Sequence, residues 1–193
     1  MRKILGIYFK PNSLDAFILI SFKELKGFKT VKINEIHFFK NEIDIIDFNN
    51  QENLELLKET NSTTRGAIKS LINLINRYLS GGKFNLIDKI NELNIELDLK
   101  DKFPTNFSES VMKNLINLKY GEVTTYSKIG NKIGSKAFRA IGTVCKSNPL
   151  PLIIPCHRVI RKNGEIGGFM GKLDETWESN LKKQLLKIEG YKI

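Results

Sequence analysis

The chain has 193 residues, of which 41% are apolar and 27% charged, and its formal net charge is +10. A chain of this length can bury one large or two small cores. The composition excludes a disulfide-rich scaffold, because Cys145 and Cys156 are its only cysteines. No apolar run approaches the roughly 18 residues of a membrane span, and MRKILGIYFKPNSLD becomes polar too early for a signal peptide, so a cytoplasmic protein is expected. With only His37 and His157 as imidazoles, neither a metal nor another cofactor is expected.

The positive charge is concentrated in the second half of the chain. Residues 1–105 carry 16 basic and 14 acidic side chains, whereas residues 106–193 carry 15 and 7. The stretch from Lys119 to Lys162 contains nine basic residues and one acid, Glu122. Such a zone favours a polyanionic partner, most commonly nucleic acid. On charge alone, a solvated surface that maintains solubility explains the zone equally well.

The first half of the chain has the pattern of a small α/β domain, placed at residues 1–100. LGIYFK, AFILISF and TVKINEIHFF are rich in β-branched and aromatic residues and predict strands. A helix is predicted over residues 64–79, opened by a Ser-Thr-Thr run and closed by Gly81-Gly82. His37 lies in an alternating strand pattern, which favours a structural role over a catalytic one.

A second, mostly helical domain is predicted over residues 104–193. The boundary lies in DLKDKFPTNF, residues 98–107, where Pro104 and polar residues interrupt the periodicity. The following stretch, SESVMKNLINLKYG, predicts a helix with one apolar face that ends at Gly121.

Two short helices follow and form a candidate helix-turn-helix. Thr125 can cap YSKIGNKIG, and Ser135 can cap KAFRAIGTVCKSN. In the second helix Lys136, Arg139 and Lys146 share one side, and Ala137, Ala140 and Gly142 keep the neighbouring surface small. Small residues allow close approach to a nucleic-acid groove, although they equally permit tight packing of helix on helix.

The segment NPLPLIIPCHRV, residues 148–159, carries the candidate nucleophile. Its three prolines restrict the backbone, and the apolar residues between them are predicted to be buried and extended. A nucleophilic Cys156 needs a base or a positive field, for which His157 and Arg158 are candidates. Adjacent side chains of an extended chain point apart, so His157 would need a helical turn or a bridging water to reach the sulfur. A buried structural cysteine is the alternative.

The motif PCHRV is preceded by NP and followed by the glycine-bearing NGEIGGFMG. Together these segments strongly resemble the active-site signature of the O6-alkylguanine-DNA alkyltransferase family, the methylated-DNA–protein-cysteine methyltransferases. YGEVTTYSKIG and KAFRAIG extend the resemblance upstream in the same order, so that it covers roughly residues 104–190. The resemblance implies a ribonuclease-H-like α/β N-terminal domain and a mostly α C-terminal domain with a helix-turn-helix. It also implies a monomer that needs no cofactor and no membrane, and whose partner is double-stranded DNA containing O6-alkylguanine.

The activity that the resemblance implies is direct-reversal DNA repair. An alkyl group, typically methyl, would pass irreversibly from O6 of a flipped-out guanine to the protein's own Cys156, once per molecule. His157 would deprotonate the thiol through a water, and Glu189 would orient His157. Tyr126 would donate a hydrogen bond or a proton to the leaving guanine. Asn148 would tie the recognition helix to the active-site loop.

The resemblance also implies positions that contact DNA or the alkylated base. Arg139 corresponds to an arginine finger that fills the place of the extruded base, and the recognition helix would enter the minor groove. The other DNA contacts implied are Ser108, Ser127, Ser135 and Lys162, and the residues implied for the alkyl and base pocket are Val159, Phe169 and Met170. Phe169 stands where many members have tyrosine, and Met170 stands where a smaller polar residue is common. The zinc ligands of some members have no counterpart here.

Three other functions fit parts of the sequence. Alkyltransferase-like proteins flip the base and only flag the lesion, but they lack the cysteine, so Cys156 argues against that role. A helix-turn-helix regulator in which Cys156 is structural or senses alkylation would suit the basic zone equally. A thiol hydrolase would use Cys156, His157 and Glu189, but it would leave Arg139 and the charge unexplained.

Overall fold

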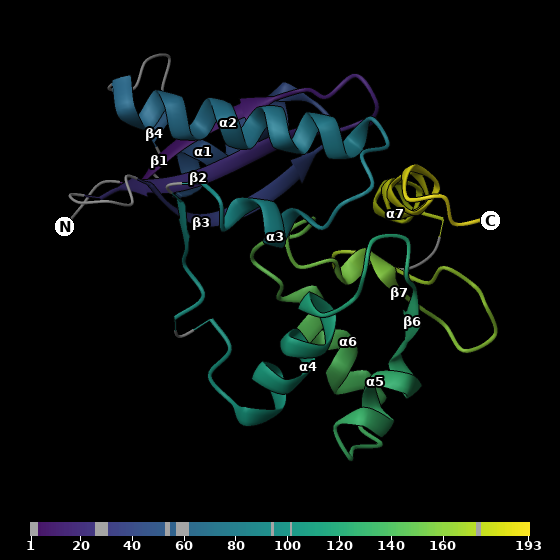
Figure 1. The fold of residues 1–193 in the computed structure, drawn as a ribbon. Helices are drawn as coiled ribbons and strands as arrows, with labels where there is room; N and C mark the ends of the chain where they lie inside the picture. Colours follow the sequence, from purple (N-terminus) through teal and green to yellow (C-terminus); the bar gives the residue numbers. More distant parts are fainter. Residues whose placement is uncertain are drawn as a thin grey trace. The chain divides into compact units, whose positions relative to one another are not determined.

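The computed structural model describes residues 4–25, 31–52, 55–56, 62–93, 95–100, 102–172 and 175–193. The chain forms two compact units, Met1–Leu99 and Lys100–Ile193 (Figure 1). In the described ranges, no helix is both long and apolar enough to cross a membrane.

The first unit is built on a five-stranded sheet in the order β4-β1-β2-β3-β5. The strands are β1 Leu5–Phe9, β2 Phe17–Glu24, β3 Val31–Phe39, β4 Glu55–Leu56 and β5 Ile95–Leu97. The first three are antiparallel neighbours, whereas β4 pairs parallel with β1 and β5 pairs parallel with β3. In β2, consecutive residues from Ile18 to Phe22 are buried, and since successive side chains alternate between faces, both faces of the sheet are covered there. The three strands predicted for this half are confirmed.

Three helices complete the first unit: α1 Glu42–Glu52, α2 Ser62–Leu79 and α3 Leu86–Ile90. The helix predicted over residues 64–79 is therefore confirmed as α2, which like α1 contacts β3. No periodicity predicted α1, because Ile43 and Ile46 are exposed and only Ile45 among its apolar residues is fully buried.

His37 has structural contacts in β3. Its Nε2 atom lies 3.0 Å from Oε2 of Glu35, and its ring centroid lies 4.6 Å from that of Phe48.

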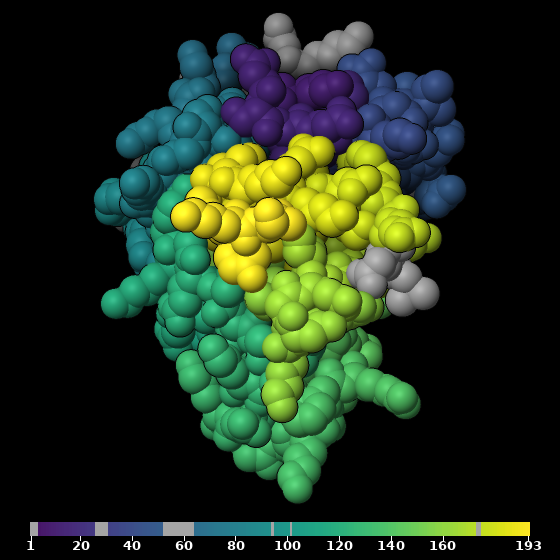
Figure 2. Space-filling view, turned by 90° about the vertical axis from the view of Figure 1, so that its right-hand side faces the viewer, coloured from purple at the N-terminus to yellow at the C-terminus, as the bar shows by residue number. Residues whose placement is uncertain are grey.

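The second unit is mostly helical, with α4 Asn106–Ile116, β6 Thr124–Thr125, α5 Tyr126–Lys132, α6 Phe138–Lys146, a single 3-10 turn η1 Cys156–Arg158, β7 Val159–Ile160 and α7 Trp177–Ile188. β6 and β7 form a short parallel pair. α6 contacts both α4 and α5, and α7 contacts η1. Figure 2 shows α7 and the chain end in yellow at the surface, beside the yellow-green segment that precedes them in this unit.

Side-chain caps begin three of these helices. Thr105 before α4 and Thr176 before α7 each form a capping box with the serine three residues later, so two backbone N–H groups at each helix start are satisfied. Thr125 accepts a hydrogen bond from the Lys128 N–H at 3.1 Å, so it caps α5 as predicted.

Two helices end or begin elsewhere than predicted. α4 ends at Ile116 instead of Gly121, because the chain turns after Asn117 and the Leu118 carbonyl accepts a hydrogen bond from Arg158 Nη1 at 2.8 Å. α6 begins at Phe138 with Ala137 as its N-cap residue. The Ser135 hydroxyl accepts from the Ala137 N–H at 3.1 Å in the turn before the helix, so it does not cap α6 as predicted.

The segment before Cys156 is buried as predicted, but the prediction that it is extended is wrong. Leu152 has φ 72°, and the Ile154 N–H donates to the Leu150 carbonyl at 2.8 Å, which closes a turn. The turn folds around Asn148, whose side chain accepts from the Leu150 N–H and donates to the Ile154 carbonyl. A short polar side chain that bonds to nearby backbone groups in this way stabilises a turn in place of an extended strand.

Candidate active site

Cys156 is the first residue of η1 and is 6% exposed. Its Sγ atom accepts a hydrogen bond from Nδ2 of Asn148 at 3.1 Å. Burial raises the pKa of the Cys156 thiol, and the Asn148 hydrogen bond and the Lys182 charge only partly oppose that rise. At neutral pH the sulfur is therefore held as a thiol, and a base is needed to make it nucleophilic.

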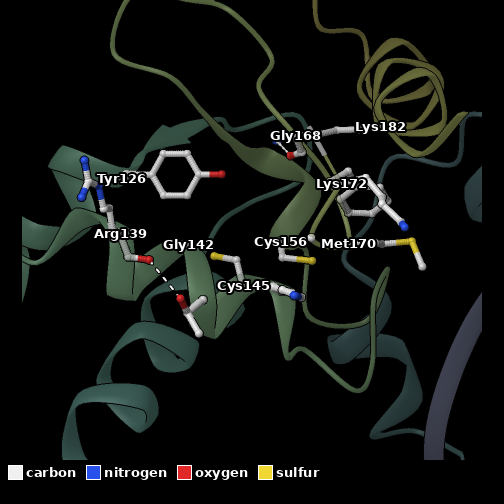
Figure 3. Close-up of a pocket in the computed structure, with 13 residues that line it drawn as sticks. Tyr126, Arg139, Gly142, Cys145, Cys156, Gly168, Met170, Lys172 and Lys182 are labelled. Atoms are coloured by element: carbon white, nitrogen blue, oxygen red, sulfur yellow. Dashed lines mark hydrogen bonds between the residues drawn. The ribbon is translucent and has the colours of Figure 1, made fainter. Parts of the chain in front are cut away.

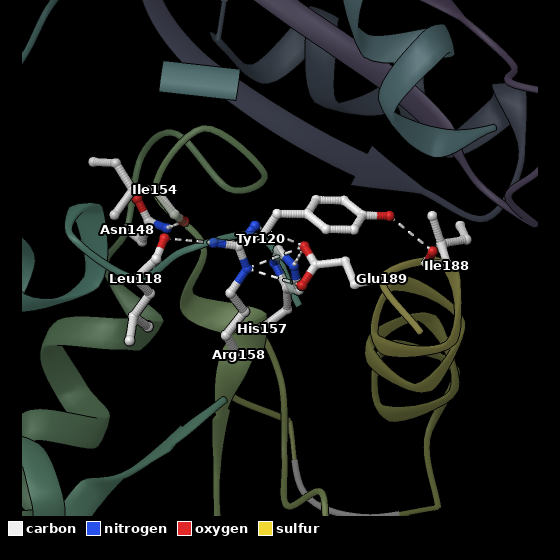
Figure 4. A network of polar contacts seen from close by, with 8 residues as sticks. All are labelled: Leu118, Tyr120, Asn148, Ile154, His157, Arg158, Ile188 and Glu189. Atoms are coloured by element: carbon white, nitrogen blue, oxygen red, sulfur yellow. Dashed lines mark hydrogen bonds and ion pairs between the residues drawn. The ribbon is translucent and has the colours of Figure 1, made fainter. Parts of the chain in front are cut away.

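The next residue in the same turn, His157, points to Glu189 (Figure 4). His157 Nε2 lies 2.9 Å from Glu189 Oε1, and both side chains are fully buried. A carboxylate can only accept, so Nε2 carries the proton and the lone pair lies on Nδ1, which is also buried. Burial lowers the pKa of His157, and Glu189 partly opposes this shift. The imidazole is therefore neutral at neutral pH, and the lone pair of Nδ1 can accept a proton.

Arg158, the last residue of η1, holds the other side of Glu189. Its Nε atom donates to Oε2 at 2.9 Å and its Nη2 atom donates to Oε1 at 2.9 Å, while Nη1 donates to the Leu118 carbonyl. Burial alone would raise the pKa of Glu189, but hydrogen bonds and charges of His157 and Arg158 lower it to about 2. Glu189 is therefore an anion shared by a neutral imidazole and a guanidinium.

Glu189 is placed by the end of α7, where it is the C-cap residue. The Tyr120 hydroxyl donates to the carbonyl of the preceding residue, Ile188, at 3.0 Å. Tyr120 and Arg158 thus both hold the end of α7. Together they fix the Glu189 carboxylate against the turn that carries Cys156.

Cys156 lines a pocket of about 310 Å³ (Figure 3). Tyr126 and Arg139 lie on one side of it in this view and Met170 and Lys172 on the other, with Cys156 between them. The full lining is Tyr126, Arg139, Gly142, Thr143, Cys145, Lys146, Cys156, Gly168, Phe169, Met170, Gly171, Lys172 and Lys182. Four of these residues are cationic and none is acidic, so the pocket suits a ligand that carries negative charge.

The loop opposite α6 is tightly turned. The backbone of Phe169 exchanges both hydrogen bonds with Lys172, and the two residues between them have positive φ, 50° at Met170 and 80° at Gly171. A methyl group on Gly171 would lie 2.4 Å from Cε of Lys146, so the lysine stem packs directly on this backbone. A larger residue at Gly171 would have to displace that stem from the pocket wall.

Lys182 and Cys145 are two of the pocket residues that the sequence reasoning did not predict as site residues. Lys182 is 1% exposed, and its Nζ donates to the Val159 carbonyl at 2.7 Å and to the Gly168 carbonyl at 3.1 Å. Nothing in the sequence distinguishes Lys182 from the other lysines of the LKKQLLK stretch. Only the packing of α7 places it in the lining of the pocket. Cys145 also faces the pocket, but burial raises the pKa of its thiol to about 12, so it is a far poorer nucleophile than a thiolate.

The predicted site residues differ in where the structure places them. Cys156, His157, Glu189 and Asn148 are joined by the contacts above, and Tyr126, Arg139, Phe169 and Met170 line the pocket with Cys156. Val159 is fully buried in β7 and is not among the lining residues; its carbonyl binds Lys182 instead.

The four other residues expected to contact DNA, besides Arg139, lie outside the pocket lining. Ser108 is 9% exposed and its hydroxyl is used in the capping box of α4. Ser127 bonds to the Thr125 hydroxyl at 3.0 Å, and Ser135 is engaged in the turn before α6. Lys162 is exposed. Their contacts with DNA stay predictions.

Within the described ranges, no group of three or more His, Cys, Asp or Glu side chains is placed to hold a metal ion.

Residues 106–191 match the family model described as "6-O-methylguanine DNA methyltransferase, DNA binding domain". A methylated-DNA–protein-cysteine methyltransferase from Mycobacterium bovis is 33% identical over 145 residues, covering 71% of this chain and 78% of that protein. A relative with the same name from Methanosarcina acetivorans is 44% identical over 87 residues, covering 45% of this chain and 52% of that protein.

The fold is similar to that of the O6-methylguanine methyltransferase of Mycobacterium tuberculosis, with a TM-score of 0.65 at 22% identity over 96% of this chain and 92% of that chain. Both the sheet-containing N-terminal part and the helical C-terminal part are therefore shared with that structure.

Proposed function

This chain belongs to the methylated-DNA–protein-cysteine methyltransferase family, and we propose that it repairs DNA by moving an alkyl group from O6 of guanine to Sγ of its own Cys156. The observation that carries the proposal is one 3-10 turn that places a buried thiol beside a buried, Glu189-bound His157, at a pocket lined by Arg139 and Tyr126. A nucleophile and an acid candidate thus line one cavity, and an oriented base follows the nucleophile in the same turn.

The proton leaves Cys156 first. The lone pair on Nδ1 of His157 accepts it through a bridging water, while Glu189 and Arg158 stabilise the resulting imidazolium. Asn148 donates a hydrogen bond that stabilises the negative sulfur. The pKa of His157 is lowered by burial, so the base stays unprotonated until the thiol transfers its proton.

Alkyl transfer follows as a displacement at the alkyl carbon. A new bond forms between Sγ and the alkyl carbon, and the bond from that carbon to guanine O6 breaks with its electron pair left on the base. The Tyr126 hydroxyl donates a hydrogen bond or a proton to the leaving guanine. The product is a thioether, which water does not hydrolyse, so each molecule reacts once.

Duplex DNA has to open before the sulfur can reach its target, because O6 lies at the base-pair edge inside the stack. We propose that α5 and α6 act as a helix-turn-helix, with α6 in the minor groove and Arg139 in the place of the extruded base. The exposed positions of Lys136, Arg139 and Lys146 support this assignment. Ser108, Ser127, Ser135 and Lys162 are proposed as further DNA contacts, Ser108 through its backbone because its hydroxyl is used in the helix cap.

The two compact units are proposed to be separate domains, residues 1–100 and 104–193. The antiparallel run β1-β2-β3 and the parallel pairing of β4 with β1 support a ribonuclease-H-like assignment for the first. The protein is proposed to act as a monomer in the cytoplasm, where its DNA substrate is accessible.

The test is intact-protein mass spectrometry after incubation with a duplex that contains O6-methylguanine, followed by peptide mapping. We expect one added methyl group on Cys156, restored guanine and a single turnover. Cys156→Ala is expected to bind the same duplex without reaction, and Cys145→Ala to react like the wild type. An unmodified wild-type protein bound to the DNA would replace the proposal with a lesion-flagging role, and methylation of Cys145 would overturn the assignment of the acceptor.

A further inference from the structure

α6 begins with an aromatic side chain that is exposed to solvent. Phe138 is 40% exposed, whereas the other apolar residues of this helix that face the core, Ile141 and Val144, are buried. In the described part of the second unit, the only other large apolar side chain with such exposure is the C-terminal residue Ile193. An exposed phenylalanine on an otherwise well-packed helix is more typical of a contact surface than of a core.

The ring of Phe138 is held in place from below. A methyl group on Gly130 of α5 would lie 2.7 Å from Cε1 and 3.0 Å from Cδ1 of the ring, and 2.5 Å from the Ser135 carbonyl oxygen. The Cδ1–Cε1 edge of the ring therefore lies against the Gly130 backbone, while part of the ring stays exposed. Its orientation is fixed before any partner binds, which lowers the entropy cost of a contact.

Phe138 extends the pocket side of α6 by one turn. Gly142 and Cys145, four and seven residues later, share its helix face and both line the pocket. The adjacent Arg139 lines the pocket as well. The exposed ring thus lies on the pocket side of α6, one turn before Gly142 and next to Arg139.

The positive charges around the ring favour a polyanionic partner that also offers an apolar surface to the ring. Lys136 and Arg139 flank Phe138 and are exposed, and no acidic residue occurs between Glu122 and Glu165. A protein surface or a lipid would meet the same ring, but a duplex offers both phosphates to the cations and sugar and base edges to the ring. Proteins that bend DNA from the minor groove use apolar side chains in this way.

We infer that Phe138 is an apolar wedge, which enters the minor groove beside the nucleotide that Arg139 displaces and helps to unstack it. The inference rests on the proposed function, since it names a second residue that opens the duplex. Arg139 fills the vacated place, and Phe138 separates the neighbouring step.

The experiment compares Phe138→Ala, Phe138→Leu and wild type on two substrates. One is a duplex with O6-methylguanine next to 2-aminopurine, whose fluorescence rises on unstacking, and the other is the free base O6-benzylguanine. Loss of one stacking aromatic is expected to slow transfer from the duplex about tenfold and to reduce the 2-aminopurine signal. Transfer from the free base is expected to stay within about twofold, because the acceptor turn is untouched. Phe138→Leu should keep most of the duplex rate.

Salt dependence separates an apolar contact from a phosphate contact. Phe138→Ala should weaken duplex binding without changing the slope of log affinity against log salt, whereas Lys136→Ala should reduce the slope by about 1. Ile43→Ala, which removes an exposed apolar side chain of α1, is the matched control and should change neither rate nor affinity.

Two results would overturn the wedge: a Phe138→Ala protein that repairs the duplex like the wild type, or one that loses duplex and free-base reaction equally. The first would make the ring irrelevant to DNA, and the second would make it a structural residue. A wild-type protein that reacts with neither substrate would instead contradict the proposed function itself.

Discussion

At the scale of single residues, the site depends on how Glu189 is shared. The carboxylate accepts from His157 and from two nitrogens of Arg158, and all three side chains are at most 2% exposed. Arg158 and His157 together therefore keep Glu189 charged inside the core. The charged carboxylate in turn fixes the tautomer of His157.

Glu189→Gln should weaken both folding and transfer. The amide leaves the Arg158 guanidinium buried without a compensating charge, which costs about 3 to 5 kcal/mol of unfolding free energy. The rate of alkyl transfer should also fall, because a neutral partner no longer stabilises the imidazolium. Urea denaturation and single-turnover kinetics measure the two effects.

The matched control for this change is Glu165→Gln, which removes an exposed carboxylate 2.7 Å from Arg161. Solvent screens a surface pair of this kind, so its loss should be nearly silent in both measurements. Equal effects of the two variants would contradict the role given to the buried network.

At the scale of elements, the connection between α6 and η1 positions the acceptor. Asn148 follows the end of α6 and makes three bonds, to the Leu150 N–H, the Ile154 carbonyl and Sγ of Cys156. The left-handed Leu152 in the same loop shows that the backbone there is held in an unfavourable conformation for a non-glycine residue. A single side chain thus joins the end of α6 to the sulfur.

Asn148→Ala should slow transfer from the duplex and from the free base alike, by about tenfold or about 1.4 kcal/mol. The reason is that it acts on the position and charge of Cys156, not on DNA. Arg139→Ala is the informative comparison, since it should slow only the duplex reaction. The measurement is the ratio of the two rate constants for each variant, and an Asn148→Ala protein impaired only on the duplex would refute this reading of the loop.

At the scale of the whole molecule, the buried titratable groups couple stability to pH. The pKa of His157 is lowered from 6.5 by burial, and that of Glu189 is lowered from 4.5 to about 2 after its partners outweigh burial. For each group, the unfolded chain binds a proton more readily than the folded one. Stability therefore rises with pH across the interval between that group's folded and unfolded pKa values. The stabilisation is complete above pH 6.5 and is lost as the pH falls.

We therefore expect the urea midpoint to be constant between about pH 7 and 8 and to fall progressively below about pH 6.5. His157→Gln should remove the part of this fall that begins near pH 6.5 and leave the part below about pH 4.5, where Glu189 titrates. A midpoint unchanged between pH 7 and 5 in the wild type would contradict the lowered pKa of His157.

Local patterns in the sequence predicted several elements correctly. β1, β2, β3 and α2 follow from periodicity and composition, and Thr125 follows from helix-capping chemistry. Cys156, His157 and Arg158 are consecutive in the chain, so the sequence makes them neighbours, but only the structure shows that they form one 3-10 turn. The charge asymmetry is likewise a property of composition and needs no fold.

Tertiary structure decided the remaining features, because each depends on contacts between residues distant in the chain. Glu189 and Lys182 reach the site only through the packing of α7, and Asn148 folds the proline-rich segment into a turn where its pattern predicted an extended chain. The exposure of Phe138 depends on the glycine in α5 beneath it. Sequence determines which side chains are available and their local periodicity, whereas burial, pKa and the lining of a cavity are set by what packs against them.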